Sequence, residues 1–496
     1  MIPRKKLIEV ALPLEAISDA SAEEKNIHTG LPANLHTWWS RKPLAASRAI
    51  LFASIIDDPG SNSNLTASEI EAERKRLHGL IEELAHPHNA NNQQVMAAVR
   101  KEIFRATTNN PPVFYDPFAG GGSIPLEAVR LGLNTYSSDL NPVAVLLNKA
   151  MIETASKYSQ TPPINPNQKG KLIDTSEYSQ AQGLLEDVLY YGEWMSTIAE
   201  KKIGHLFPKG PRGEDTIAWI WSRTVKCTNP ACGAQIPLVK KFWVSTHKGN
   251  EAWVKPNIDL ANKNIQFSIV DGESEPPEGT ITNTGAKCLV CDSPIPFKDI
   301  REAGREGRIN YKLMSVVVDN SQGRKYLPPI KKHIEIADAA IPEWEPITEL
   351  PEKALGFRVQ GYGITKHSDL FTKRQLTAIG TFAELISEAR QKVLQDSGGS
   401  EEYANAIALF LALTVDRLAQ TNNTLVRWLV RKSGTSKGTP AFDRPVVSMV
   451  WEFSEGNVFG QSVGSWNAAL KNVTSAFRSF PDKAGSGFVF QHDATA

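Results

Sequence analysis

The chain has few of the features that place a protein outside the cytosol. Its 496 residues include only 4 cysteines, too few for a scaffold built from disulfides. The longest clean apolar run, residues 49–56, is far shorter than the roughly 20 residues that cross a bilayer. The basic N-terminal stretch has no signal-peptide core, because Glu9, Pro13 and Glu15 interrupt it. We therefore expect a cytoplasmic protein without a membrane partner.

An excess of charge of either sign is also lacking. The chain has 55 Lys and Arg residues against 54 Asp and Glu residues, a net charge of +1. This balance excludes a uniformly basic coat for nucleic acid and an acidic tail protein. A nucleic-acid partner would therefore have to bind a local basic face. The length allows about two to four domains.

Residues 113–150 alternate between strand-like and helix-like patterns. The stretch VFYD is typical of a strand, and a run of glycines separates it from the helical pattern SIPLEAVRLG. A second strand, NTYSSD, and a second helix, NPVAVLLNKA, follow. This βαβα order predicts an α/β fold with a parallel sheet and crossover helices.

The turn after the first strand, Asp116–Gly122, has a composition that suits a ligand. Three consecutive glycines allow the backbone to turn tightly and to approach a bound molecule closely. The helix that follows offers unpaired N–H groups to a carboxylate or phosphate. Asp139 ends the next strand, where an acidic side chain can bind the hydroxyls of a ribose. A plain tight turn is the alternative, and the acid after the second strand favours a cofactor loop over it.

The G-x-G-x-x-G fingerprint of nicotinamide enzymes is absent, and DPFAGGG resembles the first motif of the amino-methyltransferases that act on DNA bases. That resemblance implies S-adenosylmethionine as the cofactor. Its methionine end would contact Asp116, Phe118, Gly120 and Gly122. The ribose hydroxyls would bind Asp139, and Leu140, Asn141 and Pro142 would border the adenine.

An upstream segment, LHTWWSRKPL, combines His36, Trp38 and Arg41 shortly before a predicted helix. An aromatic ring can cover an apolar cofactor face, and an arginine can pair with a carboxylate. The segment resembles the His-x-Tyr-x-Ala-Lys-Phe-Pro stretch that completes the cofactor pocket in base amino-methyltransferases, with Trp38 in place of the tyrosine and Arg41 in place of the lysine. A buried aromatic anchor with solvated charges is the alternative.

The N-terminal stretch from residue 28 resembles a narrower group, the adenine-specific DNA methylases that carry a zinc ribbon and that often lie beside bacterial anti-phage genes. The segments YGITKHSDLFTKRQL and VWEFSEGNVFGQSVGSW resemble the same group. The resemblance implies a role in DNA modification or phage defence, with DNA and other defence-system proteins as partners.

The four cysteines form two pairs, Cys227 with Cys232 and Cys288 with Cys291. Two thiolate pairs at such spacing supply the tetrahedral sulfur ligands of a structural zinc site. Four unrelated reduced thiols are the alternative. A site closed by four thiolates leaves no open position for catalysis.

Two segments are locally basic. Residues 201–250 contain nine Lys and Arg residues against two acids, with Phe242, Trp243 and Trp253 interleaved or close by. Basic and aromatic side chains together suit phosphate contact and base stacking, although a solvated ribbon face would show the same pattern. The run from Arg427 to Lys437 is a second candidate, and a plain helix face is its alternative.

The residues that would hold the acceptor amine are not found. In base amino-methyltransferases a later (Asp/Asn)-Pro-Pro-(Tyr/Phe) motif binds the amine and stacks on the flipped base. Asn110-Pro111-Pro112-Val113 precedes the glycine turn and has no aromatic residue. The C-terminal FVFQHDATA resembles the strand and acidic turn that come before that motif, which implies that Asp493 contacts the cofactor adenine. The catalytic residues are therefore unknown, and we expect a truncated or split gene product or a second polypeptide that supplies them.

The expected fold is a Rossmann-like methyltransferase sheet interrupted by a large insert that holds a zinc ribbon and a helical segment. The expected segments are as follows: 1–56, completing the cofactor pocket; 57–110, a helical excursion; 111–154, the first part of the core; 155–216, a helical connection; 217–330, the zinc ribbon; 331–445, a mostly helical insert; and 446–496, an incomplete return to the core.

The leading hypothesis is a DNA amino-methyltransferase that forms N6-methyladenine and is incomplete in this chain. One alternative is a non-catalytic DNA- or cofactor-binding subunit of a defence complex. Another is an RNA methyltransferase, because the cofactor motifs do not distinguish the two nucleic acids.

Overall fold

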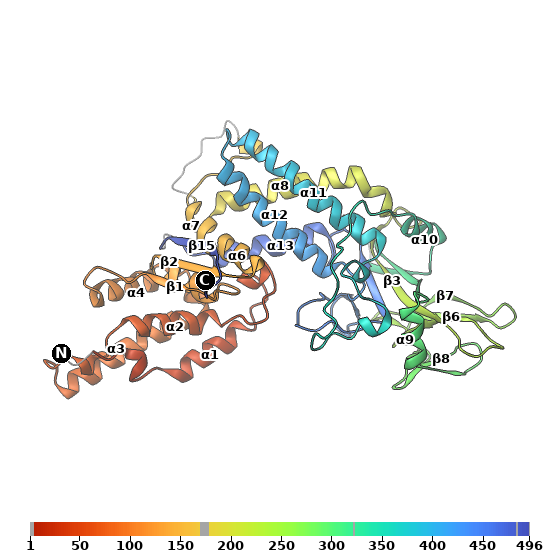
Figure 1. Cartoon of the computed structure of the whole chain (residues 1–496), viewed down its shortest axis with the longest axis horizontal. Helices are drawn as coiled ribbons and strands as arrows, with labels where there is room; N and C mark the ends of the chain where they lie inside the picture. Colours follow the sequence, from red (N-terminus) through yellow and green to blue (C-terminus); the bar gives the residue numbers. More distant parts are fainter. Residues whose placement is uncertain (1–3, 169–177, 321–322, 483–484, 496) are drawn as a thin grey trace. The chain divides into compact units, whose positions relative to one another are not determined.

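The computed structural model describes residues 4–168, 178–320, 323–482 and 485–495 (Figure 1). The chain divides into two compact units. Unit 1 consists of Met1–Tyr191, Arg390–Leu413 and Asn472–Ala496, and unit 2 of Gly192–Ala389 and Thr414–Lys471. Both units are therefore discontinuous in sequence.

A parallel three-stranded sheet forms the centre of the glycine-turn region in unit 1. Its strand order is β1 (Phe114–Asp116), β2 (Thr135–Asp139) and β15 (Gly487–Gln491). The central strand β2 therefore pairs with β1 on one side and with β15 on the other. Helix α5 (Ser123–Arg130) connects β1 to β2, and α6 (Pro142–Asn148) follows β2. The α6 helix continues through a π-helical turn, Lys149–Thr154, into the short α7 (Ala155–Lys157). The expected strand–helix alternation is present.

The two faces of this sheet differ. Thr135, Ser137 and Val489 are buried on the face that α5 and α6 cover. The alternate positions, on the other face, carry the partly exposed aromatic rings of Tyr115, Tyr136, Phe488 and Phe490. The Tyr136 ring stacks on Phe488 with centroids 4.9 Å apart. Parallel sheets are usually covered on both faces, so this aromatic face is unusual.

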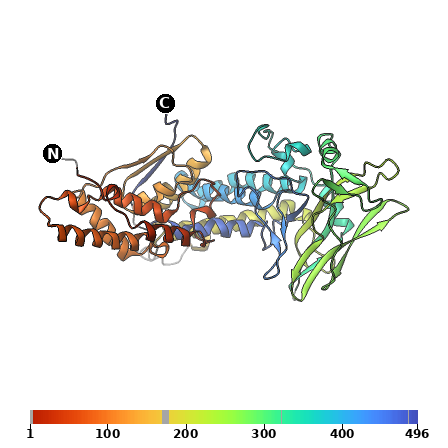
Figure 2. The ribbon, with the colours of Figure 1, turned by 90° about the horizontal axis from the view of Figure 1, so that it is seen from below.

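Four helices pack beside this sheet in unit 1 (Figure 2). They are α1 (Leu14–Glu24), α2 (Leu44–Ile55), α3 (Ala67–Ala85) and α4 (Gln93–Ala106). Thr66 begins α3 with a capping box to Glu69, and the Asn92 side chain accepts the first N–H groups of α4. Phe52, Ile81 and Leu131 contribute to their shared apolar core. The predicted helical excursion thus consists of two capped helices.

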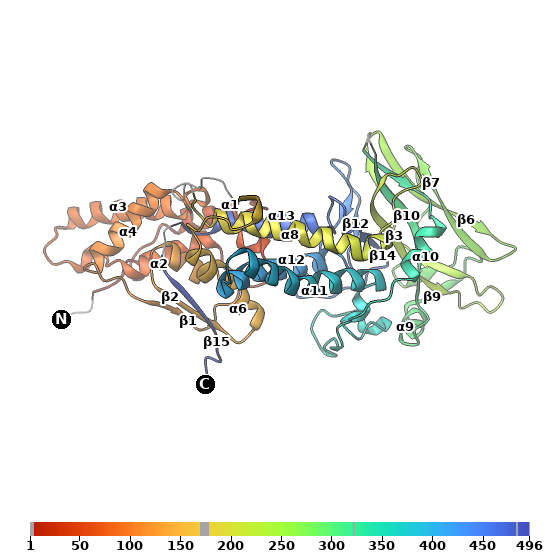
Figure 3. The ribbon, with the colours of Figure 1, turned by 90° about the horizontal axis from the view of Figure 1, so that it is seen from above.

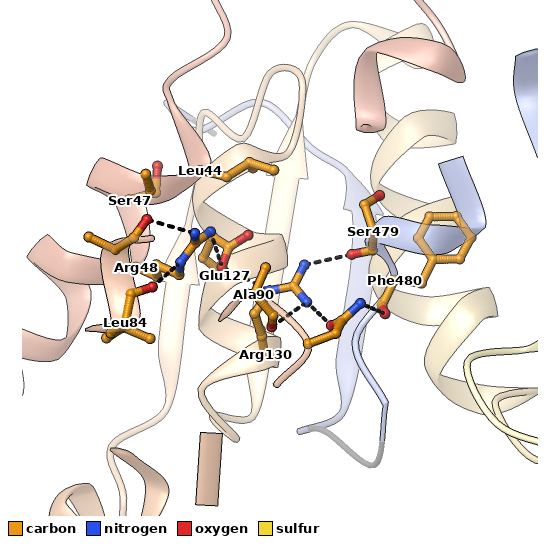
Figure 4. Close-up of polar contacts among 12 residues, drawn as sticks. Leu44, Ser47, Arg48, Leu84, Ala90, Glu127, Arg130, Ser479 and Phe480 are labelled. Atoms are coloured by element: carbon orange, nitrogen blue, oxygen red, sulfur yellow. Dashed lines mark hydrogen bonds and ion pairs between the residues drawn. The ribbon is translucent and has the colours of Figure 1, made fainter. Parts of the chain in front are cut away.

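A buried charged network joins these elements (Figure 4). The Glu127 carboxylate on α5 accepts a hydrogen bond from Arg130 Nε at 2.9 Å and lies 3.6 Å from Arg48 Nη1 on α2. Arg48 also donates to the Leu84 carbonyl at 2.6 Å, and Arg130 donates to the Ser479 carbonyl at 2.6 Å. One carboxylate and two guanidinium groups therefore connect α2, α3, α5 and the segment before β15.

Unit 2 is built on a five-stranded sheet. The long central strand β3 (Asp215–Lys226) is buried from Thr216 to Val225. Its partners, all antiparallel, are β10 (Asn310–Asn320), which also pairs β11 (Gly323–Leu327), together with β4 (Gln235–Leu238) and β14 (Glu452–Gly456). A three-stranded antiparallel sheet contains β5 (Trp243–His247), β6 (Asn250–Asp259) and β7 (Asn264–Asp271). Two hairpins are smaller: β8 (Gly285–Lys287) with β9 (Pro294–Pro296), and β12 (Trp428–Leu429) with β13 (Lys437–Gly438).

The remaining helices are α8 (Gln182–Ile203), α9 (Phe297–Arg305), α10 (Lys331–Asp338), α11 (Lys373–Asp396), α12 (Glu401–Thr421) and α13 (Trp466–Ser475). Figure 3 shows α8, α11 and α12 as the long helices of the chain. The predicted helices at 183–203 and within 401–421 are present. No helix in the described ranges is long and apolar enough to cross a membrane.

One sequence prediction was wrong. Residues 446–471 do not return to the parallel sheet, since β14 pairs β3 in unit 2. A buried ion pair of 2.8 Å between Glu455 on β14 and Arg374 on α11 fixes this placement.

Candidate cofactor site and cysteine cluster

The glycine turn follows β1 directly and begins α5. The Asp116 carboxylate accepts the Phe118 N–H at 3.0 Å, and the Ala119 N–H donates to the Ser138 carbonyl at 3.1 Å. Gly120 and Gly122 have φ angles of +50° and +74°, in the left-handed region where a side chain is unfavourable. The loop is therefore fixed at both ends and needs glycine at these two positions.

Asp139 holds this loop from the end of β2. Its Oδ2 accepts the Gly120 N–H at 2.8 Å, and its Oδ1 accepts the Asn141 N–H at 2.9 Å. The Asn141 side chain in turn caps α6 by accepting the Val143 N–H at 2.9 Å. Each carboxylate oxygen of Asp139 can accept a second hydrogen bond, so capacity for two hydroxyl donors remains. Gly120, Asp139 and Asn141, three of the residues predicted to bind the cofactor, are thus joined by hydrogen bonds beside the glycine turn.

Trp38 lies on the same loop. A Cβ atom added at Gly121 would lie 2.8 Å from Trp38 Cγ, and one at Gly120 would lie 3.0 Å from Trp38 Nε1. The predicted proximity of this segment to the glycine turn is therefore present in the structure. His36 is half-buried and Arg41 is exposed, and their contact with a cofactor stays a prediction.

Asn148 is a site residue that the sequence reasoning did not find. Its Nδ2 donates to the Gly120 carbonyl at 3.0 Å, and its Oδ1 is buried without a partner among the described residues. A Cβ at Gly122 would lie 2.7 Å from that Oδ1 and 2.5 Å from Met151 Cε. A spacing of seven residues from Asn141, two helical turns, could have indicated that Asn148 shares its face. Asn148 is therefore packed beneath the glycine loop and holds its Gly120 carbonyl in place.

Two carboxylates lie close together here. Burial raises the pKa of Asp116, the Phe118 N–H opposes that shift, and the charge of Asp139 adds to it. A positively charged ligand beside Asp116 and Asp139 would offset this repulsion. The Phe118 ring, 75% exposed, stands at the edge of the same loop. The electrostatics of the site therefore favour a cationic ligand.

The end of β15 reaches the same region. The His492 N–H donates to the Asp139 carbonyl at 3.3 Å, and Gln491 Nε2 donates to the Leu140 carbonyl at 3.1 Å. Asp493 is exposed and its Oδ1 accepts both the N–H and the hydroxyl of Thr495, contacts that lower the pKa of Asp493. Its role at an adenine stays a prediction.

The four cysteines converge in unit 2. Their sulfur atoms all lie within 4.8 Å of one another. Cys227 Sγ is 3.7 Å from Cys291 Sγ, and Cys232 Sγ is 3.8 Å from Cys288 Sγ. Zinc–sulfur bonds of about 2.3 Å in a tetrahedron place the sulfurs about 3.8 Å apart, so the cluster fits such an ion and is too wide for disulfides. The four cysteines could bind a metal.

The predicted nucleic-acid face of the first basic segment needs correction. Phe242 and Trp253 are 0% and 7% exposed and pack in the core of unit 2, so their rings are not available for base stacking. Arg223 is 2% exposed and donates to the Val450 carbonyl at 2.8 Å. The lysines of this segment, in contrast, are exposed.

A parallel sheet with a glycine loop at the end of one strand and a carboxylate at the end of the next defines the class of α/β nucleotide-cofactor sites. Residues 98–192, which contain this arrangement, match the family profile of the D12 class N6 adenine-specific DNA methyltransferases. Residues 11–80, which contain the Trp38 segment, match a protein family of unknown function, DUF1156.

A curated relative supports the same class. The Type II methyltransferase M.MvaI of Kocuria varians is 30% identical over 100 residues, which are 20% of this chain and 20% of that protein. This chain therefore spans only about a fifth of the relative it matches. No solved structure matches the chain. The matches support a DNA methyltransferase, and that family implies the use of S-adenosylmethionine.

Proposed function

We propose that the chain supplies the cofactor side of an S-adenosylmethionine-dependent amino-methyltransferase that forms N6-methyladenine in DNA, in a modification or phage-defence setting. The observation that carries this proposal is the meeting of Trp38, Gly120, Asp139 and Asn148 within or beside the segment that matches the methyltransferase family. The two neighbouring carboxylates and the free acceptor capacity of Asp139 suit a cationic cofactor that carries hydroxyl groups.

Each side chain has a role in holding the cofactor. Asp139 would accept the two ribose hydroxyls, and Asn148 would hold the glycine loop in position from below through the Gly120 carbonyl. Trp38 would cover the loop and exclude water. The cofactor supplies a methyl group on a positively charged sulfonium, so transfer to an amine depends on orientation more than on a strong base. Asp116 and Asp139 would favour that positive charge before transfer.

We also propose that the four cysteines form a structural zinc ribbon. The sulfur spacings support a closed set of four ligands with no position for water. Zinc would therefore stabilise unit 2 and take no part in methyl transfer.

In this proposal, the residues that clamp the acceptor lie outside residues 123–496, either in another part of the same protein or in a second polypeptide. No (Asp/Asn)-Pro-Pro-(Tyr/Phe) motif follows Gly122 in the sequence. Among the described strands β1 pairs only β2, so its other edge, next to Asp116, has unpaired backbone groups. A strand paired there in parallel would end beside the glycine loop. The exposed rings of Tyr115 and Tyr136 would be covered by the same segment.

The test is transfer of a labelled methyl group from S-adenosylmethionine to duplex DNA, followed by digestion to nucleosides. We expect label in N6-methyladenine when the chain is combined with a polypeptide that carries the acceptor motif, and none with an Asp139→Ala variant. Label in cytosine, or in structured RNA but not in DNA, would contradict the proposed substrate.

A second candidate is a non-catalytic subunit that binds DNA for a defence complex, and the exposed lysines of unit 2 favour it. Calorimetry separates the two functions. DNA binding without any S-adenosylmethionine binding would support the non-catalytic subunit.

A further inference from the structure

The two basic segments of the sequence meet around one cavity in unit 2. The β5–β6 hairpin carries Lys248 from the first segment, and the loop of the β12–β13 hairpin carries Arg431 and Lys432 from the second. The β10–β11 hairpin is a third wall. The cavity has a volume of about 790 Å³, and we call it the hairpin cleft. Its lining residues include Ser245, His247, Lys248, Arg324, Lys325 and Ser436.

Direct contacts hold these hairpins together. Trp428 on β12 donates its Nε1–H to the Val244 carbonyl on β5 at 2.8 Å. Arg324 on β11 donates to the Ser436 carbonyl in the β12–β13 loop, and Asn250 Nδ2 donates to the Arg324 carbonyl at 3.0 Å. Each hairpin is therefore bonded to another, and the cleft is a formed feature of the fold.

Cations outnumber acids at the hairpin cleft. Lys248, Arg324 and Lys325 line it together with two acids, Glu251 and Asp271. Arg431 and Lys432 in the adjoining loop bring the cations to five, against four acids when Glu214 and Asp319, which interact electrostatically with Lys325 and Arg324, are included. All of these cations except Arg324 are exposed. None of the five forms an ion pair with a carboxylate of residues 178–320 or 323–482.

The lining indicates the chemistry of the ligand. Small-molecule pockets are mostly apolar, whereas the hairpin cleft has one aromatic side chain, that of Tyr326, and is otherwise polar and charged or glycine. Exposed cations that form no ion pair in these ranges instead suit a polyanion, because binding it releases condensed counterions. Cations on two separate hairpins can contact successive phosphates of one backbone.

We propose that the hairpin cleft binds the phosphate backbone of duplex DNA. The inference rests on the proposed function and adds the surface through which unit 2 contacts the substrate. Phosphate contacts of this kind position the duplex and do not read its sequence.

The test is binding of a fluorescent DNA duplex by the full chain and by Lys248→Glu/Lys325→Glu. We expect affinity to fall at least about ten-fold, and the slope of log affinity against log salt to decrease by about 1.8, since each phosphate contact contributes about 0.9. Arg431→Glu/Lys432→Glu should act in the same way. The matched control is Lys298→Glu/Lys353→Glu, which changes the charge equally at exposed lysines outside the cleft.

Cofactor binding and zinc content, measured on each variant, show that it is folded. Equal DNA affinity of the cleft variants and wild type would overturn the proposal that the hairpin cleft binds DNA. The proposed methyltransferase function would not be affected by that result. An equal loss in the control variant would also overturn it, because charge alone would then explain the effect. Failure of the wild-type chain to bind DNA, with cofactor binding intact, would reject both the cleft and DNA as the partner.

Discussion

Glu127 lies at the centre of a buried charged network in unit 1. Its carboxylate is fully buried between Arg130, which donates at 2.9 Å, and Arg48. Burial lowers the pKa of Arg48, and the nearby carboxylate opposes that shift. Removing the Glu127 charge would leave both buried guanidinium groups without their shared counter-ion, with backbone carbonyls and, for Arg48, the Glu24 charge as the remaining compensation.

We therefore expect Glu127→Gln to lower the free energy of unfolding by about 3–5 kcal/mol. The control is Glu73→Gln, which removes a partly exposed partner of Arg76 and should cost less than about 1 kcal/mol. Urea unfolding measures both. A loss at Glu127 no larger than that at Glu73 would show that the network in Figure 4 adds little stability.

Glu452 predicts a pH dependence in unit 2. Burial raises the pKa of its carboxyl group to about 7, against contributions from the Lys240 and Lys241 backbone that lower it. A raised pKa in the folded state means that the fold prefers the protonated acid, so its contribution to stability is lost as pH rises from about 4.5 to about 7. Glu452→Gln should therefore stabilise the protein relative to wild type more at pH 8 than at pH 5. Identical differences in urea midpoint at the two pH values would contradict this.

Among the local elements, the cysteine cluster is where the proposed zinc ion would couple metal binding to folding. We expect about one zinc ion per chain by elemental analysis, and its removal by a chelator should unfold the β8–β9 region. Cys288→Ser should lower the zinc content and the thermal midpoint together. Unchanged stability after complete metal removal would reject a structural role. Cofactor binding by unit 1 should survive, which separates this effect from general unfolding.

Local sequence patterns predicted individual turns, strands and helices better than they predicted which of these elements contact one another. The glycine turn, Asp139 and the four cysteines were found because each chemistry needs particular residues at a particular spacing. Asn148 was missed because its role depends on the π-helical continuation of α6 and on a backbone carbonyl. The placement of β14 was wrong because a buried Arg374–Glu455 pair, which no spacing reveals, joins it to unit 2.

Across the full chain, sequence order and spatial order differ. β15 lies far along the sequence from β2, yet its register places Gln491 opposite Asp139. Two basic segments flank the hairpin cleft. Their local excess of positive charge is not apparent from the net charge of +1 for the full chain. We therefore propose that unit 1 binds the cofactor and that unit 2 contacts phosphate, and the second proposal depends on the first.

The most direct test is calorimetric titration of S-adenosylmethionine into the full chain and into Gly121→Ala. The added methyl group would lie 2.8–2.9 Å from Trp38, so we expect one site in wild type and at least a ten-fold loss, about 1.4 kcal/mol, in the variant. Gly79→Ala, which has no atom within 4 Å of the added Cβ, should bind as wild type does. No binding by the wild-type chain, or equal binding by Gly121→Ala, would contradict the cofactor site.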